Sequence, residues 1–254
     1  MNFDLATAEL LAIMLGAVRT GAWMMLCPPF NSRLIPGQVK VLLSIGLTLP
    51  MAPYLRQTVP SLETRDLIAS AALQVFIGAA LGFLTLMLFA AIQAAGDLLD
   101  LFGGFTLAMA YDPWSMSQSS IFGRFYQLLA VTMLFASDGH QLILRGFLQS
   151  FRTLPLDTAF TMETFSRLLV RGIGEMFVAA VQIAGPLIAV LFLADVALGL
   201  LNRVAPALNA FQLGFPIKIF LVVTLSGIAI AMLPGVLDTL VDKAVTAVVR
   251  LSGG

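Results

Sequence analysis

Residues 67–95 read LIASAALQVFIGAALGFLTLMLFAAIQAA, a run of 29 residues without one charged side chain. Since an α-helix rises about 1.5 Å per residue, this run predicts a helix about 43 Å long. The hydrocarbon core of a bilayer is about 30 Å thick, so the predicted helix is longer than one straight crossing. Gly78 and Gly82 are four residues apart within it, the spacing that lets two helix backbones approach closely.

Composition extends this prediction to the whole chain. The 254 residues are 59% hydrophobic and 11% charged, whereas soluble domains carry about 25% charged residues. We therefore predict an all-α integral membrane protein, a single domain over residues 1–254 with about six long apolar helices. Their uneven lengths favour a packed helical assembly over a simple up-and-down bundle in lipid. The six segments are 5–30, 39–55, 67–95, 121–136, 175–201 and 215–240.

Polar side chains interrupt several of these segments. A charge that faces lipid at mid-bilayer costs about 3 kcal/mol or more, so we expect these groups to face other protein or water. Two interpretations stay open, an inter-helix hydrogen bond or ion pair, and a direct role in transport. The groups are Arg19, Gln74, Gln93, Gln182 and Asp195.

Helix packing is predicted at a small set of positions. Gly185-Pro186 lies inside the 175–201 segment, where proline removes a backbone hydrogen bond and kinks the helix. We expect close contact with other protein at this pair, at the Gly78–Gly82 face and at Arg19.

Charge and motif content argue against several classes of function. Fourteen basic and fourteen acidic residues leave no net charge, so nothing favours binding to nucleic acid. A single cysteine, Cys27, and a single histidine, His140, argue against a zinc site of the usual kind, and we expect Cys27 to be a buried thiol. No nucleophile–base set or phosphate-binding loop is present. We predict no enzyme, no metal and no cofactor.

The carboxylates Asp97 and Asp100 follow the 67–95 segment and lie three residues apart on one helix face. Paired carboxylates can share a proton or bind a cation, but we expect both to reach water where the chain leaves the bilayer. The Lys/Arg balance between alternate loops gives no membrane orientation. Residues 137–174 carry four arginines and periodic apolar positions, which favour further helices in this connection.

A second connection, residues 103–120, reads GGFTLAMAYDPWSMSQSS. It is too short and too polar to cross a bilayer. Asp112-Pro113 predicts a turn within it, because the residue before proline avoids helical geometry.

Residues 194–218 read ADVALGLLNRVAPALNAFQLGFPIK and carry the densest pattern in the chain. The segment leaves one helix, turns through a stretch of asparagine and proline, and enters a second apolar helix after Pro216. Arg203 and Lys218 at the two helix ends predict a short, positively charged hairpin tip.

This stretch resembles the signature of the FliR/SctT family, the export-gate subunit of flagellar and injectisome type III secretion. The family pattern has an acidic residue in the fifth segment, an Arg–x–x–Pro turn, an Asn-x-Phe, and a Pro-x-Lys that opens the last helix. Arg19, Pro29, Pro36 and Lys40 agree in the N-terminal part, and LGFPIK is more similar to the flagellar branch. The matching hairpin residues are Asp195, Arg203, Pro206, Asn209, Phe211, Pro216 and Lys218.

The resemblance implies a structural, pore-forming subunit that conducts unfolded flagellar proteins across the bacterial inner (cytoplasmic) membrane, within the flagellar basal body. Residues 1–172 would be a FliP-like part and residues 173–254 a FliQ-like helical hairpin, joined with FliP-like and FliQ-like subunits in a helical ring embedded in lipid. FlhB-like and FlhA-like export components are further implied partners. An injectisome subunit of the same family is the alternative within the family.

The resemblance also implies that residues 103–120 enter the pore and plug it. The residues implied in the plug are Phe102, Gly103, Gly104, Phe105, Met109, Asp112, Pro113, Met116 and Phe122. A different class of function, a proton-coupled secondary transporter, would use Asp97, Asp100 or Asp195 as proton carriers. Such transporters usually consist of two matching halves, and the two halves of this chain differ in segment length and loop pattern.

Overall fold

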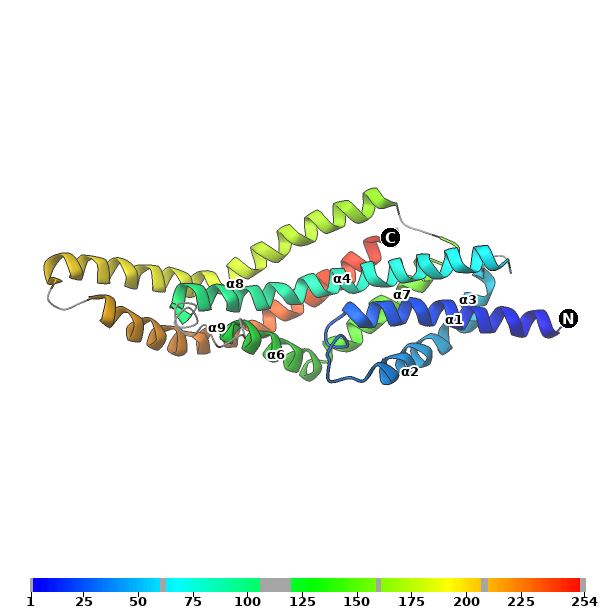
Figure 1. The fold of residues 1–254 in the computed structure, drawn as a ribbon, viewed down its shortest axis with the longest axis horizontal. Coiled ribbons are helices and arrows are strands. Elements are labelled where there is room, and N and C mark those ends of the chain that lie inside the picture. The colour runs from blue at the N-terminus through cyan, green and yellow to red at the C-terminus, as the bar shows by residue number, and fades with distance from the viewer. Residues whose placement is uncertain (1, 60–62, 106–119, 159–160, 207–209, 252–254) are drawn as a thin grey trace. The chain divides into compact units, whose positions relative to one another are not determined.

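The computed structural model describes residues 2–59, 63–105, 120–158, 161–206 and 210–251. Within these ranges it contains helices and no strand, so the predicted all-α fold is confirmed (Figure 1). The elements are α1 (Asn2–Leu26), α2 (Gly37–Thr48), η1 (Leu49–Met51), α3 (Ala52–Leu55), η2 (Arg56–Thr58), α4 (Thr64–Gly103), α6 (Ile121–Ala136), α7 (Gly139–Thr153), α8 (Met162–Val204) and α9 (Ala210–Leu251).

The predicted apolar segments are helical except for residues 27–30, which follow the end of α1, and three helices are longer than their apolar runs. α4, α8 and α9 have 40, 43 and 42 residues, which corresponds to about 60–65 Å and twice the thickness of a hydrocarbon core. Five helical stretches of the described chain are long and apolar enough to cross a membrane, and α6 is a shorter apolar helix. The second predicted segment continues after α2 as short turns of helix that contain Pro50 and Pro53.

The chain forms two compact units that alternate along the sequence. Unit 1 consists of Met1–Leu88, Ser137–Ile173 and Leu240–Gly254, and unit 2 consists of Phe89–Ala136 and Gly174–Thr239. The helices α4, α8 and α9 each contribute one part to each unit. Glycine contacts and a small number of buried polar groups determine the packing within each unit.

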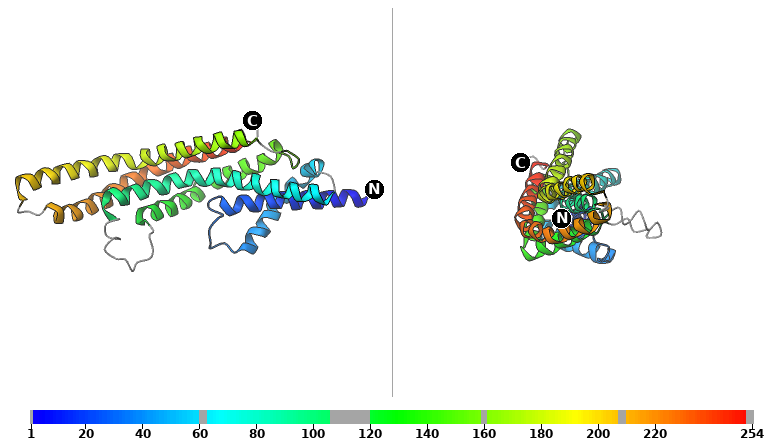
Figure 2. Two further views of the ribbon diagram at one scale, coloured as in Figure 1. Left: turned by 45° about the horizontal axis from the view of Figure 1, so that its top comes forward. Right: turned by 90° about the vertical axis from the view of Figure 1, so that its left-hand side faces the viewer.

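In unit 1, the N-terminal part of α4 lies beside α1 (Figures 1 and 2), and its two spaced glycines are at the contact. A Cβ atom placed at Gly78 would collide with the carbonyl oxygen of Arg19. A Cβ atom at Gly82 would lie 2.7 Å from the carbonyl oxygen of Trp23. Both positions therefore require glycine, because any side chain would push the two backbones apart.

The 137–174 connection forms an amphipathic helix, α7, as its periodicity predicts. Phe147 stacks on Trp23 of α1 with ring centroids 4.3 Å apart, while Arg145 and Arg152 are exposed. Beyond the end of α1, Cys27 is buried as expected. Burial raises the pKa of the Cys27 thiol, which makes it a poor nucleophile.

The guanidinium group of Arg19 ties α1, α4 and α7 together inside unit 1. Arg19 is fully buried, and its Nε donates a hydrogen bond of 2.6 Å to Oε1 of Gln74 on α4. Its Nη1 donates to the carbonyl oxygen of Leu154, at 2.8 Å, and to that of Ser150, at 3.4 Å. The guanidinium also lies over the Phe151 ring, 4.6 Å from the centroid.

These hydrogen bonds give Arg19 the role of a C-cap supplied from another helix. The last carbonyl groups of a helix have no partner within it and carry partial negative charge, and Arg19 donates to the carbonyl groups at the end of α7. Gln74 extends the network, since its Nε2 donates to the carbonyl oxygen of Leu156, 3.0 Å away. A charge inside an apolar bundle is thus compensated by carbonyl dipoles and one side-chain amide.

Substitution of Arg19 tests this network. Arg19→Met is expected to lower the thermal unfolding temperature strongly, because each buried acceptor left without a donor costs about 1–3 kcal/mol. Arg19→Lys should fall between this variant and wild type, since an ammonium group cannot reproduce the planar fork. Circular dichroism of the detergent-purified protein measures the order of the three.

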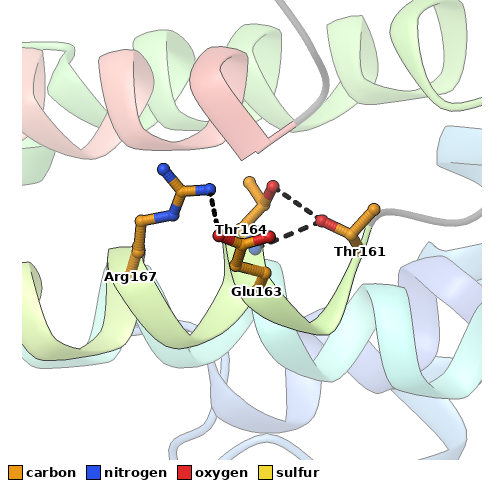
Figure 3. Close-up of polar contacts among 4 residues, drawn as sticks. All are labelled: Thr161, Glu163, Thr164 and Arg167. Carbon is orange, nitrogen blue, oxygen red and sulfur yellow. Dashed lines mark hydrogen bonds and ion pairs between the residues drawn. The ribbon is translucent and has the colours of Figure 1, made fainter.

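A matched control is Arg167→Met in the first turns of α8. Arg167 forms an ion pair with Glu163 at 2.7 Å, with side chains 72% and 76% exposed (Figure 3), and such exposed pairs contribute only about 0–1 kcal/mol. If Arg167→Met lowered the unfolding temperature as much as Arg19→Met, the buried network would have no special role.

Candidate functional site

Unit 2 brings together the two ends of the 103–120 connection and the α8–α9 hairpin. α4 ends at Gly103, and Gly104 follows with a φ of +83°, a left-handed conformation typical of glycine just after a helix end. The N–H of Gly104 donates to the carbonyl oxygen of Leu101 at 3.3 Å. Residues 106–119, which include the predicted plug residues Met109, Asp112, Pro113 and Met116, lie outside the described residues.

The carboxylate of Asp100 joins the two ends of this connection. Its Oδ2 accepts a hydrogen bond from the Ser120 hydroxyl and one of 3.0 Å from the backbone N–H of Phe122. The Ser120 Oγ in turn accepts from the N–H of Gly123 at 2.8 Å. Two of the free N–H groups at the start of α6 are therefore satisfied.

Ser120 is thus the N-cap of α6, and Asp100 is a second cap supplied from α4. An N-cap side chain contributes about 0.5–2 kcal/mol, and a hydrogen bond to a charged group about 1.5–3 kcal/mol. The negative charge is also placed at the positive end of the helix dipole.

The expectation that Asp97 and Asp100 both reach water is wrong for Asp100. Asp97 is exposed, whereas Asp100 is only 2% exposed. The physical reason is that a carboxylate oxygen of Asp100 accepts hydrogen bonds from the start of α6, so the side chain turns inward. Its other oxygen, Oδ1, is buried without a hydrogen-bond partner among the described residues.

The close approach of α4 and α6 depends on Gly96, a position that the sequence analysis missed. A Cβ atom there would lie 2.5–2.6 Å from the backbone of Phe122 and Gly123. Gly123 is equally restricted, since its Cβ would collide with the Asp97 carboxylate. A usable signal existed for Ser120, because serine immediately before an apolar run is a typical N-cap, but nothing in the sequence pairs Gly96 with Phe122.

Aromatic and apolar contacts surround the ends of the connection. The rings of Phe105 and Phe122 meet edge to face with centroids 5.4 Å apart. A Cβ atom at Gly104 would lie 3.5 Å from the Phe215 ring, and one at Gly103 would lie 2.8 Å from Val222. Phe102, the remaining predicted plug residue in the described chain, is exposed. The two ends of the connection therefore pack on each other, and the first end also packs on α9.

An ion pair connects the two arms of the hairpin. Lys218 Nζ lies 2.6 Å from Asp195 Oδ1, with the lysine side chain 20% and the aspartate side chain 46% exposed. Near the tip, a Cβ atom at Gly214 would lie 3.2 Å from Leu198, so α8 and α9 are also close there. Two interpretations were open for the polar groups inside the apolar segments, an inter-helix hydrogen bond or ion pair and a direct role in transport. The contact of Asp195 with Lys218 is an inter-helix ion pair.

The predicted positive charge at the hairpin tip needs a correction. Lys218 lies eight residues inside α9, which begins at Ala210, and Asp195 pairs with it. Pro216 does not open the helix but lies within it, because proline is tolerated inside apolar helices when neighbouring groups satisfy the freed carbonyl. Arg203 is exposed in the last turn of α8, where a cation complements the helix dipole.

The remaining predicted positions are placed as follows. Pro206 is exposed just after α8, Asn209 lies outside the described residues, and Phe211 lies in α9 with a side chain that is not described. Pro186 is inside α8, and a Cβ atom at Gly185 would have no neighbour within 4 Å. Arg19, Gly78 and Gly82 belong to unit 1.

No reactive centre is apparent in these surroundings. The described residues contain no group of three or more His, Cys, Asp or Glu side chains that could hold a metal ion. Both arms of the hairpin instead expose large apolar side chains that suit lipid or other protein. They are Phe192, Leu193, Val196, Leu200, Leu201, Val204, Leu213, Phe215, Ile217, Phe220 and Val223.

Charge reversal tests the ion pair of the hairpin. Asp195→Lys and Lys218→Asp are each expected to lower the unfolding temperature, because each places two like charges side by side. The double variant should recover most of the loss, since it restores an opposite pair. Thermal unfolding in detergent measures the cycle, with Arg203→Met as an exposed control. Purely additive losses would mean that the pair contributes nothing.

Comparison with known proteins shows the family to which this chain belongs. The chain matches the family described as bacterial export proteins, family 1, over residues 10–244. It is 33% identical to the flagellar biosynthetic protein FliR of Bacillus subtilis (strain 168), with 82% of each chain covered. It is also 33% identical to FliR of Pectobacterium carotovorum subsp. carotovorum, over 85% of this chain and 83% of that one. For FliR of Escherichia coli (strain K12), the identity is 30%, over 80% and 77% of the two chains. The chain therefore belongs to the bacterial export proteins, family 1, and the predicted FliR resemblance is confirmed.

Proposed function

We propose that this member of the bacterial export proteins, family 1, is a structural, pore-forming subunit of a flagellar export gate. It conducts unfolded flagellar proteins across the bacterial inner membrane, as part of the flagellar basal body. The observation that carries the proposal is the family match over residues 10–244, which includes both the ends of the 103–120 connection and the hairpin. The relatives named above are flagellar biosynthetic proteins, which supports the flagellar rather than the injectisome branch.

The surface of the chain supports a place in an assembly. α8 and α9 expose large apolar side chains together with a half-exposed ion pair. An ion pair cannot face hydrocarbon without a large cost, so this surface lies against other protein or water on at least one side. FliP-like and FliQ-like subunits, with FlhB-like and FlhA-like components beside them, are the proposed partners. Residues 1–172 take the FliP-like role and residues 173–254 the FliQ-like role.

The proposed plug is the loop 103–120. Its ends are joined by the Asp100 carboxylate and by the contact of Phe105 with Phe122, so the loop leaves and re-enters the helices at one place. These contacts lie outside residues 106–119, so a displacement of those residues need not break them. Irregular backbone at membrane depth is tolerated where it lines a cavity inside protein.

The transporter alternative has less support. It requires carboxylates that are free to bind and release protons, whereas Asp100 caps α6 and Asp195 is paired with Lys218. Of the three candidate carboxylates, Asp97 is exposed, as a group with a purely hydrated role would be.

Purification tests the proposed assembly. In mild detergent the tagged protein is expected to co-purify with FliP-like and FliQ-like subunits in one large complex, because its apolar surface needs protein as well as lipid around it. Mass spectrometry of the purified particle and its native mass measure this. A lone monomer that moves a small solute in reconstituted vesicles would contradict the proposal and favour a transporter.

Deletion tests the proposed plug. Replacement of residues 106–119 by a short Gly/Ser linker retains Phe105, Ser120 and all described helices, so the complex should still assemble. Cells that express it are expected to leak ions or small solutes, because the apolar bulk of the loop is gone, and uptake of a normally excluded dye measures the leak. Wild-type complex at the same membrane level is the control. Unchanged permeability with normal assembly would remove the plug from the proposal.

A further inference from the structure

We propose that Asp97, Asp100 and Ser120 form a binding site for a divalent cation with oxygen ligands, Ca²⁺ in the first place. The three side chains lie where the end of α4 meets the start of α6, within unit 2. All three belong to the described residues, and the site uses no residue of 106–119. The inference goes beyond the proposed function and does not depend on it.

Two carboxylates and one hydroxyl group converge at this place. The Ser120 hydroxyl donates a hydrogen bond to Oδ2 of Asp100. Ser120 Oγ and Asp97 Oδ1 both lie within 2.5 Å of the position that a Cβ atom on Gly123 would occupy. Two ligands of one Ca²⁺ lie up to about 5 Å apart, because each Ca–O bond is about 2.3–2.6 Å long. The spacing of these oxygens therefore fits a single cation.

The buried oxygen Oδ1 of Asp100 is the observation that points to a ligand. Asp100 is only 2% exposed, and its other oxygen, Oδ2, accepts the hydrogen bonds from Ser120 and from the N–H of Phe122. Oδ1 has no hydrogen-bond partner among the described residues. A buried carboxylate oxygen without a partner is costly. A bound cation would compensate its charge directly.

The charge balance of the site also favours a cation. Asp97 and Asp100 occupy the last two turns of α4, and its last turn contains no basic residue. The C-terminal end of a helix carries partial negative charge, so two carboxylates are unfavourably placed there. Neither carboxylate forms an ion pair within the described residues. The two hydrogen bonds from the start of α6 compensate Oδ2 of Asp100 alone, so negative charge remains for a ligand.

The choice of Ca²⁺ follows from the kind and number of the oxygens. Carboxylate oxygens suit hard cations, and Ca²⁺ accepts about six to eight oxygens in flexible geometry, whereas Mg²⁺ needs a near-ideal octahedron. Asp97 is exposed, so water molecules can complete the coordination from the solvent side. With only two carboxylates the site is simpler than a dedicated metal centre, and we expect a dissociation constant on the order of 0.1–1 mM.

Calcium titration of the full-length protein in detergent tests the site. Divalent cations are first removed with a chelator, and the thermal unfolding temperature is then recorded as Ca²⁺ is added. We expect a saturable rise of about 3 °C or more at about a tenfold excess over the dissociation constant. Equilibrium dialysis with radioactive Ca²⁺ should show one site per chain. Mg²⁺ should give a smaller rise, and choline chloride of equal ionic strength none.

Two variants and a control connect this response to the site. Asp97→Asn removes one charged ligand and leaves the hydrogen bonds of Asp100 in place, so the affinity for Ca²⁺ should fall about tenfold or more. Ser120→Ala removes the hydroxyl ligand and should weaken binding less. Asp238→Asn changes an exposed carboxylate of α9 elsewhere in unit 2, and this matched control should respond to Ca²⁺ as wild type does.

Several results would overturn the inference. An equal rise with Ca²⁺, Mg²⁺ and choline chloride would indicate general screening of charge, and an unchanged Ca²⁺ response in Asp97→Asn would place the cation elsewhere. Absence of any rise in wild type overturns it too. If acid then stabilises wild type but not Asp97→Asn, the two carboxylates share a proton instead.

Ser120→Ala decides the matter if Asp97→Asn fails to fold. A weakened Ca²⁺ response in Ser120→Ala, with a normal response in Asp238→Asn, supports the site. An unchanged response in Ser120→Ala would then overturn it.

Discussion

The backbones of α1 and α6 approach α4 closely at its glycines, and both units depend on this close contact. Helices without a strong hydrophobic drive between them associate where small residues let the backbones meet. In unit 1, Gly78 and Gly82 meet the carbonyl oxygens of α1, and in unit 2, Gly96 meets the first turn of α6. The buried polar contacts described above form only because these approaches bring distant side chains within hydrogen-bonding reach. Arg19 can reach the end of α7, and Asp100 the start of α6, from positions next to such crossings.

The three polar groups with the clearest roles are compensated in different ways. Arg19 is surrounded by carbonyl oxygens at a helix C-terminus, Asp100 by an N–H and a hydroxyl at a helix N-terminus, and Asp195 by an opposite charge. The first two use the partial charges of helix ends, which require no second ionised residue. Only 11% of the residues are charged, and the sites of Arg19 and Asp100 each need only one charged side chain.

Sequence reasoning reached the helices more easily than the contacts between them. The limits of α6 coincide with those of the predicted apolar segment 121–136, and the buried face of α7 follows from its periodicity, because both depend on local pattern alone. The burial of Asp100 depends on which backbone passes opposite it, and the place of Lys218 depends on whether the last helix begins at Pro216 or before it. These are tertiary outcomes, and local sequence carries no signal for them. The glycine spacing at 78 and 82 is the exception, because it marks a crossing without naming the partner.

The interleaving of the two units has a consequence for synthesis. Unit 1 needs the end of α9, where Val245 lies against Gly146 of α7 at van der Waals distance from its Cβ position. Unit 2 needs the hairpin up to Thr239. A ribosome releases the N-terminal residues first, so neither unit can complete its core until almost the whole chain has emerged. The early helices must therefore wait in a partly packed state, with the face of α7 at Gly146 not yet covered by α9. A chain built in this way depends on translation finishing, and a truncated product would have no independently folded part to accumulate.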